Sequence, residues 1–169
     1  MIKEDKLAIY YRSKLAMVRD SKVNDVFDLA PNMRESDKKE IWKSHHKNAE
    51  EALLDGYMES TICLTVEYKE RPIAMFGIVP HTLLSSKASV WLLASPDLMK
   101  IKGAFLKNSR KFIKYFLSYY RLLENFVDMQ NMDSRRWLKW CGAEFGQISA
   151  YGVEKQPFQY FRFRRENYV

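Results

Sequence analysis

Hydrophobic and polar residues alternate along residues 61–68, whose sequence is TICLTVEY. A period of two residues is typical of a β-strand that buries one face. The nearly continuous apolar stretch 73–79 follows after a short charged turn. We therefore predict a β-hairpin formed by these two segments.

A helical period replaces this alternation in residues 105–120. Apolar side chains recur there every three or four residues, and lysine and arginine side chains occupy the opposite side. Such a pattern predicts an amphipathic helix with one face in the core. Shorter helices are predicted at 23–30, after Ser36 as N-cap, at 50–58 and at 134–140.

Further strands are predicted at 15–18, 89–95, 126–129, 145–151 and 158–164. The order is a short strand, helices, three antiparallel strands, a helix, a strand, a helix and two strands, which indicates a mixed α/β domain. The strands at 90–94 and 126–129 should be parallel neighbours that diverge at one end, because the long helix crosses between them. One buried cluster should contain the large side chains of Leu92, Phe112, Phe116 and Trp137.

At 169 residues, with 47% hydrophobic residues, the chain is long enough for one domain with its own core. Residues 1–14 are interpreted as an N-terminal extension of that domain. Cys63 and Cys141 are far apart in apolar surroundings, which predicts buried free thiols. The adjacent His45 and His46 diverge on a helix and cannot share one ion, so no metal site is expected.

The chain is basic, since lysine and arginine exceed aspartate and glutamate by 28 to 21 and the net charge is +7. A basic surface favours anionic partners without choosing among them. The N-terminus lacks the apolar core of a signal peptide, and the longest apolar run is too short to span a bilayer. We therefore expect a cytoplasmic protein without a membrane span.

The most specific pattern lies in residues 125–145, NFVDMQNMDSRRWLKWCGAEF. Asn131 precedes Ser134 by three residues, and Leu138 and Gly142 follow in register. This pattern resembles the last strand–helix unit of the GCN5-related N-acetyltransferase (GNAT) fold, N-x-x-A-x-x-L-Y-x-x-x-G-F. The resemblance implies a single GNAT-like α/β domain with a mixed, mostly antiparallel sheet. The sheet would be splayed near its fourth and fifth strands, with helices on both faces.

Leu138 stands where active GNAT proteins usually carry a tyrosine that acts as the general acid. A leucine side chain cannot donate a proton to a departing thiolate. The general base is also missing from its usual neighbourhood, because strand 90–94 contains no carboxylate. The remaining candidates are Glu67, His81 and Asp97, although a solvated strand end or a helix cap explains the two carboxylates as well. Whether the chain is an enzyme therefore stays open at this point.

The resemblance also implies a site for acetyl-CoA. The family holds the pyrophosphate with backbone N–H groups at a helix start, in the pattern Q/R-x-x-G-x-G/A. The matching string here is SPDLMKIKGAF, in which Phe105 occupies the place of the second small residue. The residues that the resemblance places at the cofactor are Leu93, Ala94, Lys100, Lys102, Gly103, Ala104 and Asn131. The alternative is a basic loop and helix start on a solvated face.

Arg34, Glu35 and Asp37 form a second candidate cluster. In the resemblance they lie in the loop between the first helices, which walls the groove for the acceptor substrate in GNAT proteins. The alternative is a helix start with balancing charges.

Four strings, at residues 32–37, 72–77, 90–93 and 131–142, resemble bacteriophage proteins related to the internal virion protein A of short-tailed phages. This resemblance implies a virion-assembly or internal-virion protein with degenerate catalytic machinery. Such a protein would lie in the host cytoplasm or the virion and bind a phage or host protein. The alternative is an active acetyl-CoA-dependent N-acetyltransferase. Nucleic-acid binding through the helix face Lys102–Lys114 ranks third, because exposed aromatic residues are not interleaved with the basic ones.

Overall fold

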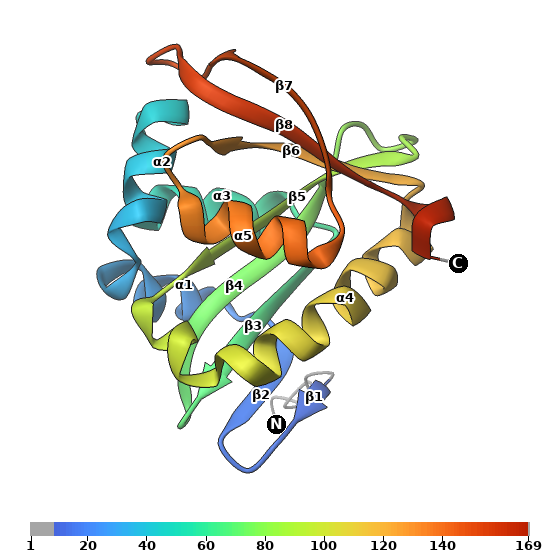
Figure 1. Ribbon diagram of the computed structural model, residues 1–169. Helices are drawn as coiled ribbons and strands as arrows, with labels where there is room; N and C mark the ends of the chain where they lie inside the picture. Colours follow the sequence, from blue (N-terminus) through green and yellow to red (C-terminus); the bar gives the residue numbers. More distant parts are fainter. Residues whose placement is uncertain (1–8, 169) are drawn as a thin grey trace.

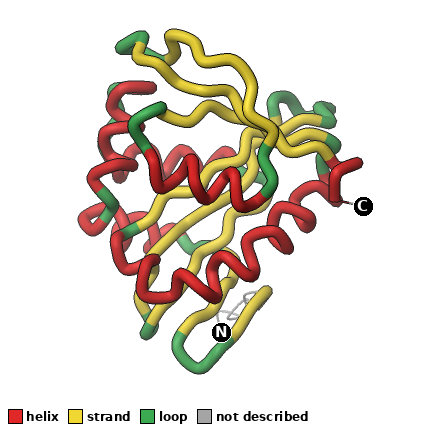
Figure 2. Tube along the Cα trace, viewed as in Figure 1, coloured by secondary structure: helices red, strands yellow, loops and turns green. Residues whose placement is uncertain are grey.

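The computed structural model of the chain describes residues 9–168, which form one α/β domain (Figures 1 and 2). Its strands and α-helices are β1 (Ile9–Arg12), β2 (Ala16–Asp20), α1 (Val23–Leu29), α2 (Glu35–His45), α3 (Ala49–Glu59), β3 (Ile62–Tyr68), β4 (Arg71–Pro80), β5 (Lys87–Ala94), α4 (Lys102–Tyr119), β6 (Leu122–Asp128), α5 (Met132–Cys141), β7 (Glu144–Tyr151) and β8 (Gln156–Arg164). Three 3₁₀ helices complete the described chain, namely η1 (Ala30–Asn32), η2 (Pro96–Ile101) and η3 (Arg165–Tyr168).

The strands form a single sheet in the order β1-β2-β3-β4-β5-β6-β8-β7. Within the described chain, neighbouring strands are antiparallel except for β5 and β6. The parallel pairing of β5 with β6 joins Lys87–Ser89 to Leu122–Glu124, and beyond it the two strands diverge (Figure 1). The predicted crossover is therefore confirmed, and so is the splay of the sheet.

Helices cover both faces of the sheet, with α1, α2 and α3 on one face and α4 and α5 on the other (Figure 1). The central strand β4 supplies side chains to both layers. Met75 packs in the cluster of α1 and α3, whereas Phe76 packs in the cluster that contains Phe116 of α4. Because both faces of β4 are covered, its sequence is nearly all apolar instead of alternating.

Several boundaries differ from the predictions. α2 begins at Glu35 with Arg34 as its N-cap, so Ser36 lies inside the first turn. β6 begins at Leu122, four residues before the predicted strand at 126–129, because its first residues pair with both β5 and β8. Glu124 and Asn125 interrupt the apolar pattern of this segment, so the pattern predicts a shorter strand. Pairing with β5 and β8 extends the strand through these two residues.

The predicted core cluster is correct for Phe116, which is fully buried. Phe112, Leu92 and Trp137 pack against the same cluster but are half-buried. Trp137 donates its indole N–H to Ser109 Oγ at 2.9 Å. The four side chains therefore share one cluster, as predicted, with Phe116 at its centre and the other three partly buried against it.

The N-terminal residues add a strand that the sequence pattern does not predict. β1 falls within residues 1–14 and pairs with β2, and the part of that segment before residue 9 lies outside the described residues. Both cysteines are free, and Cys141 is buried. Within residues 9–168 no helix is both long and apolar enough to cross a membrane.

Candidate functional site

A cavity of about 390 Å³ lies where β5 and β6 diverge. Residues of α2 and α3 line it on one face of the sheet, and residues of α5 line it on the other. The last residue of β7, Tyr151, and Phe161 of β8 also contribute to its wall. Strands paired along their full length would leave no such space, so the short β5–β6 pairing creates the cavity.

One edge of β5 offers backbone hydrogen-bonding groups to this gap. The Ser95 N–H donates to a β4 carbonyl at 2.8 Å, so antiparallel alternation directs the backbone groups of Leu92 and Ala94 away from β4 and towards the gap. The Asn125 side chain reaches across from β6 and donates to the Val90 carbonyl at 3.0 Å. Leu92 lies beyond the segment that pairs with β6.

A polar group that we call the Asp37 clasp, formed by Arg34, Asp37, Ala94 and Asn131, closes the end of the gap. The Asp37 carboxylate accepts the Ala94 N–H at 3.0 Å and two guanidinium N–H groups of Arg34 at 2.9 and 3.1 Å. The Ala94 carbonyl accepts the Arg34 N–H at 2.8 Å. Asn131 Nδ2 donates to Asp37 at 3.4 Å. Both backbone groups of Ala94 are therefore occupied by α2.

Burial raises the pKa of Asp37 above its ordinary value, although the positive charge of Arg34 and the Ala94 N–H act in the opposite direction. The Asp37 carboxylate is thus enclosed and fully engaged. Its position indicates a structural role at the junction of α2, β5 and α5.

Glu40 projects from the next turn of α2 and lines the cavity. Its Oε2 accepts the Asp128 N–H at 3.0 Å and Asn131 Nδ2 at 3.1 Å. Burial raises the pKa of Glu40 from 4.5 to about 7; the two hydrogen bonds oppose this shift, and the negative charges of Asp37 and Asp128 reinforce it. A carboxyl group with such a pKa can take up or release a proton at neutral pH, as general acid–base catalysis requires.

Tyr151 enters the same cavity from the end of β7. Its ring stacks on Phe126 with centroids 4.2 Å apart and packs against Phe158 at 5.1 Å. Burial, together with the negative charge of Glu40, raises the pKa of the Tyr151 phenol. The phenol is therefore protonated at neutral pH and can act as a hydrogen-bond or proton donor.

The turn after Tyr151 is fixed to the C-terminal end of α2. The Val153 and Glu154 N–H groups donate to the carbonyls of Ser44 and Lys43 at 2.9 and 3.0 Å. Gly152, with φ 75°, approaches so closely that a Cβ atom there would lie 2.5 Å from Ser44 Cα. α2 therefore spans the gap from the Asp37 clasp at its start to this turn at its end.

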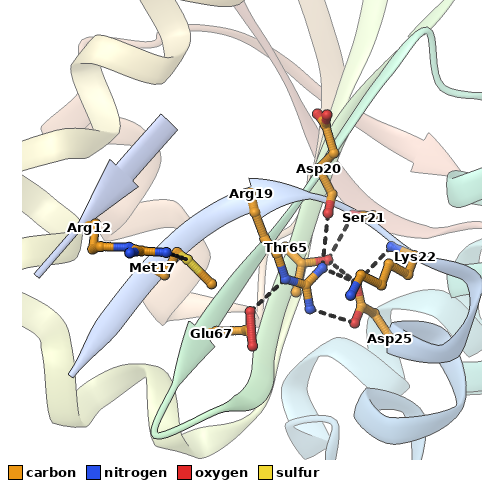
Figure 3. A network of polar contacts seen from close by, with 9 residues as sticks. All are labelled: Arg12, Met17, Arg19, Asp20, Ser21, Lys22, Asp25, Thr65 and Glu67. Carbon is orange, nitrogen blue, oxygen red and sulfur yellow. Dashed lines mark hydrogen bonds and ion pairs between the residues drawn. The ribbon is translucent and has the colours of Figure 1, made fainter. Parts of the chain in front are cut away.

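Glu67, the first candidate base, lies outside the cavity lining, in a separate polar network (Figure 3). Its carboxylate accepts from Arg19 Nε at 2.5 Å, and Arg19 also pairs with Asp25 at 2.8 Å. Thr65 donates its hydroxyl to Asp25 at 2.8 Å. These contacts join β2, β3 and α1, so the structure gives Glu67 a role in holding elements together.

The other two candidate bases also lie outside the cavity lining. His81 lies in the β4–β5 turn, near the end at which β5 and β6 are paired, and its Nδ1 is 3.7 Å from the Glu124 carboxylate. Asp97 lies in η2, where it forms an ion pair with Lys100 at 2.9 Å. Ser95 caps this 3₁₀ helix and accepts the Asp97 N–H.

Of the residues expected at the cofactor, Leu93 lines the cavity, and Ala94 and Asn131 belong to the Asp37 clasp. The residues expected to wall the acceptor groove lie in two different places. Arg34 and Asp37 form the clasp, whereas Glu35 is exposed and pairs with Lys38 at 3.0 Å.

The expected phosphate-binding residues lie at the start of α4. Its first turn has no side-chain cap and no acidic residue, and a Cβ atom on Gly103 would meet nothing within 4 Å. The Lys102 N–H donates to the Met99 carbonyl and Lys100 pairs with Asp97, so the N–H groups that follow in the first turn, with the Lys102 side chain beside them, are the groups that suit a phosphate. Ala104 faces a separate, small apolar pocket next to β2. The helix start is thus the part of the chain that could hold the phosphates of an acyl-CoA. On the gap edge of β5, the backbone groups of Ala94 are occupied, whereas Leu92 lines the cavity.

Leu138 is 4% exposed and is part of both the core and the cavity wall. Glu40 and Tyr151 are not among the residues predicted from the sequence. Asp37 and Glu40 are one helical turn apart beside the buried Ile41, a spacing that could have indicated a polar stripe on a packed face. No sequence signal identifies Tyr151.

Comparison with solved structures places this architecture among acetyltransferases. A GNAT-family acetyltransferase from Bacillus anthracis superposes with a TM-score of 0.67 at 12% identity, covering 94% of this chain and 99% of its own. The ribosomal-protein-S5-alanine acetyltransferase of Vibrio fischeri gives 0.68 at 11% identity, with 96% and 99% covered. A spermidine N-acetyltransferase from Vibrio cholerae, solved with CoA and spermine, gives 0.65 at 12% identity, with 92% and 99% covered.

No protein-family model matches the sequence, and no curated protein matches it. The chain nevertheless has the GNAT fold over nearly its whole length, as the strand–helix pattern around Asn131 predicts. Identities this low establish the fold and not the reaction.

Proposed function

We propose that this protein is an acyl-CoA-dependent N-acyltransferase in which Glu40 acts as the general base. The observation that carries the proposal is the position of the Glu40 carboxylate, in the wall of the cavity between the diverging strands. The GNAT fold supports the same class of reaction. This function is the alternative that the sequence offers to a virion-assembly role.

The chain's own residues supply the proton chemistry. Glu40, when ionised, can remove the proton from an amine acceptor in the cavity. The N–H groups of Asp128 and Asn131 hold one carboxylate oxygen and so orient the side chain. Tyr151, protonated in the same cavity, can deliver a proton to the leaving group. This assignment replaces the tyrosine that is missing at position 138.

An acyl-CoA, when bound, supplies the acyl group in activated thioester form. The first turn of α4, with Lys102 and Gly103, would hold its phosphates, and the edge of β5 at Leu92 would face its arm. The Asp37 clasp lies at Ala94, at the end of the same edge. A ligand that reaches from the cavity to α4 must pass or displace it.

Two observations favour a second candidate, a GNAT scaffold without turnover. Both backbone groups of Ala94 are engaged by α2, and Leu138 is buried. A scaffold role agrees with the predicted virion-assembly function. No feature of the fold tests that prediction. The phage relationship, the protein partner and the location in the host cytoplasm or the virion stay predictions.

The Glu40→Gln variant tests the proposal. With acetyl-CoA and a panel of amine-bearing acceptors, we expect kcat/KM to fall by roughly 10²–10⁴, because that is the usual effect of losing a general base. Glu35→Gln is the matched control, since Glu35 lies on the same helix but its side chain is 76% exposed. It should leave the rate unchanged.

The two candidate functions give different outcomes. Equal rates for wild type and Glu40→Gln would exclude Glu40 as the base. A wild-type protein that turns over no acceptor, including those of a cell extract, would instead support the scaffold.

A further inference from the structure

The turn between β4 and β5 presents two apolar side chains at its tip. Ser85 N–H donates to the Thr82 carbonyl at 3.1 Å, so Leu83 and Leu84 occupy the two central positions of a β-turn. Each of these leucines is 99% exposed. The turn projects beyond the neighbouring strands on the side of the molecule near the C-terminus (Figures 1 and 2).

This composition is unusual for a turn. Central turn positions favour glycine, asparagine, aspartate or proline, because those residues suit the backbone and are solvated at no cost. Single exposed leucines are common on protein surfaces, but two adjacent and fully exposed ones form a small apolar tip. Neither leucine belongs to the hydrophobic clusters of the described chain.

The base of the turn is well defined. His81 N–H donates to the Lys87 carbonyl at 3.2 Å, and Lys87 N–H donates to Ser85 Oγ at 3.0 Å. β4 and β5 remain paired up to Pro80 and Ala88. The two leucines are therefore held on a rigid hairpin.

Three cationic residues lie near the base of this hairpin. Arg121 N–H donates to the Ser86 carbonyl at 2.8 Å, and Arg165 N–H donates to the Arg121 carbonyl at 3.0 Å. Lys87 and Arg121 are exposed, whereas the Arg165 guanidinium donates to the Leu117 and Ser118 carbonyls at 2.5 and 3.3 Å. This corner therefore holds three positive charges, two of them on exposed side chains, in a chain whose net charge is +7.

Two acidic residues, Glu124 and Glu166, lie near this corner, and each has a hydrogen-bond or ion-pair partner. Glu124 is partly buried, accepts a hydrogen bond from Tyr160, and lies 3.7 Å from His81. Glu166 is paired with Arg164 at 2.8 Å. Lys87, Arg121 and Arg165 therefore outnumber the one described carboxylate here without a cationic partner, Glu124, and the corner around the hairpin is positively charged.

We propose that the β4–β5 turn docks this protein on an anionic lipid surface, with Leu83 and Leu84 inserted among the lipids and the exposed Lys87 and Arg121 facing the headgroups, while Arg165 adds its charge from behind them. Apolar side chains that enter the interface and cations that remain at its surface are the two contributions by which peripheral proteins bind membranes.

A lipid surface fits the tip better than a protein partner does. A stable protein interface buries about 800 Å² on each partner, whereas the apolar part of this tip consists of two side chains on a convex turn. Insertion into lipid needs no matching pocket, and its strength grows with each apolar group inserted and each cation placed near the headgroups. With two leucines and three cations, the binding should be reversible and sensitive to salt.

Vesicle sedimentation tests this proposal with the whole protein. We use vesicles of phosphatidylcholine alone and vesicles of phosphatidylcholine mixed with phosphatidylglycerol. Wild type should bind the mixed vesicles, bind the neutral ones at least about tenfold more weakly, and dissociate as ionic strength rises. Leu83→Ser/Leu84→Ser should lower the partition coefficient at least about tenfold, because it removes both inserted side chains.

Met58→Ser is the matched control, because Met58 is a large apolar residue on α3 that is 71% exposed. It should bind like wild type, and unchanged melting temperatures should show that all variants are folded. Quenching by brominated lipids of the indole introduced by Leu83→Trp, measured against wild type, reports insertion directly. Failure of wild type to bind, equal binding by the double leucine variant, or absence of that quenching would overturn the proposal.

Discussion

Two carboxylates on α2 show how the environment of a residue decides its chemistry. Glu35 and Glu40 are chemically identical, and five positions separate them. The Glu35 side chain is 76% exposed beside Lys38. Glu40 is enclosed between α2, the end of β6 and the start of α5, and burial raises its pKa to about 7. Desolvation of one side chain therefore accounts for the candidate base.

The raised pKa makes the free energy of unfolding depend on pH. In the unfolded chain Glu40 should release its proton near pH 4.5, but in the folded protein near pH 7. Between these values the folded state binds more protons, so stability falls as pH rises, by up to about 3 kcal/mol. This contribution is fully present below pH 4.5 and is lost above pH 7.

Glu40→Gln removes this titration. Urea unfolding at pH 5 and pH 8 should show the variant gaining stability relative to wild type between the two values. Glu35→Gln is the control on the same helix, because the Glu35 side chain is 76% exposed. A constant difference between Glu40→Gln and wild type across that range would contradict the raised pKa.

At the scale of elements, α2 organises the site because one of its sides lies along the gap between β5 and β6. Asp37 contacts the end of β5, Glu40 contacts the end of β6, and the carbonyls of Lys43 and Ser44 hold the β7–β8 turn. Residues that recur every three or four positions share one side of a helix, so a single helix can serve all three elements. The site therefore depends on how α2 is seated.

Gly152→Ala tests this seating. The new Cβ atom would lie 2.5 Å from Ser44 Cα, at a residue with φ 75°. Because backbone cannot move aside as a side-chain end does, we expect a loss of about 1–3 kcal/mol in unfolding free energy, measured with urea.

Gly103→Ala is the matched control in α4, where a Cβ atom would meet nothing within 4 Å. It should be neutral or stabilise by up to about 1 kcal/mol, because alanine favours the helix. Equal effects of the two substitutions would mean that the β7–β8 turn is not packed against α2.

At the scale of the whole molecule, the divergence of β5 and β6 produces the cavity and also determines which part of β5 a ligand can reach. The same divergence of β5 and β6 that opens the cavity leaves the end of β5 to be closed by the Asp37 clasp. The fold thus has a cavity between β5 and β6, and α2 limits how far a long ligand can extend from it along β5.

Thermal unfolding with acetyl-CoA measures whether this arrangement admits the ligand. At a concentration of about a hundred times its dissociation constant, a bound ligand stabilises the native state by roughly 2.7 kcal/mol. We expect a corresponding rise in melting temperature, and a smaller one for Lys102→Glu at the start of α4. No rise at millimolar acetyl-CoA would favour the scaffold without turnover.

The sequence by itself determines the features that depend on local periodicity. The alternation in residues 61–68, the helical period of 105–120 and the spacing from Asn131 to Gly142 are properties of short segments, and they predict the GNAT fold correctly. The parallel relation of β5 and β6 follows as well, because a single helix that crosses over one face of a sheet typically joins parallel strands.

Only the tertiary structure decides the site. The pKa of Glu40, the occupation of Ala94 and the place of Tyr151 arise where residues 34–44, 90–94, 125–131 and 151–154 meet. Glu67, a candidate base by sequence, instead pairs with Arg19, a partner 48 positions away. Solvation and hydrogen bonding are set by atoms that are close in space, and residues far apart in the chain supply those atoms only after it has folded.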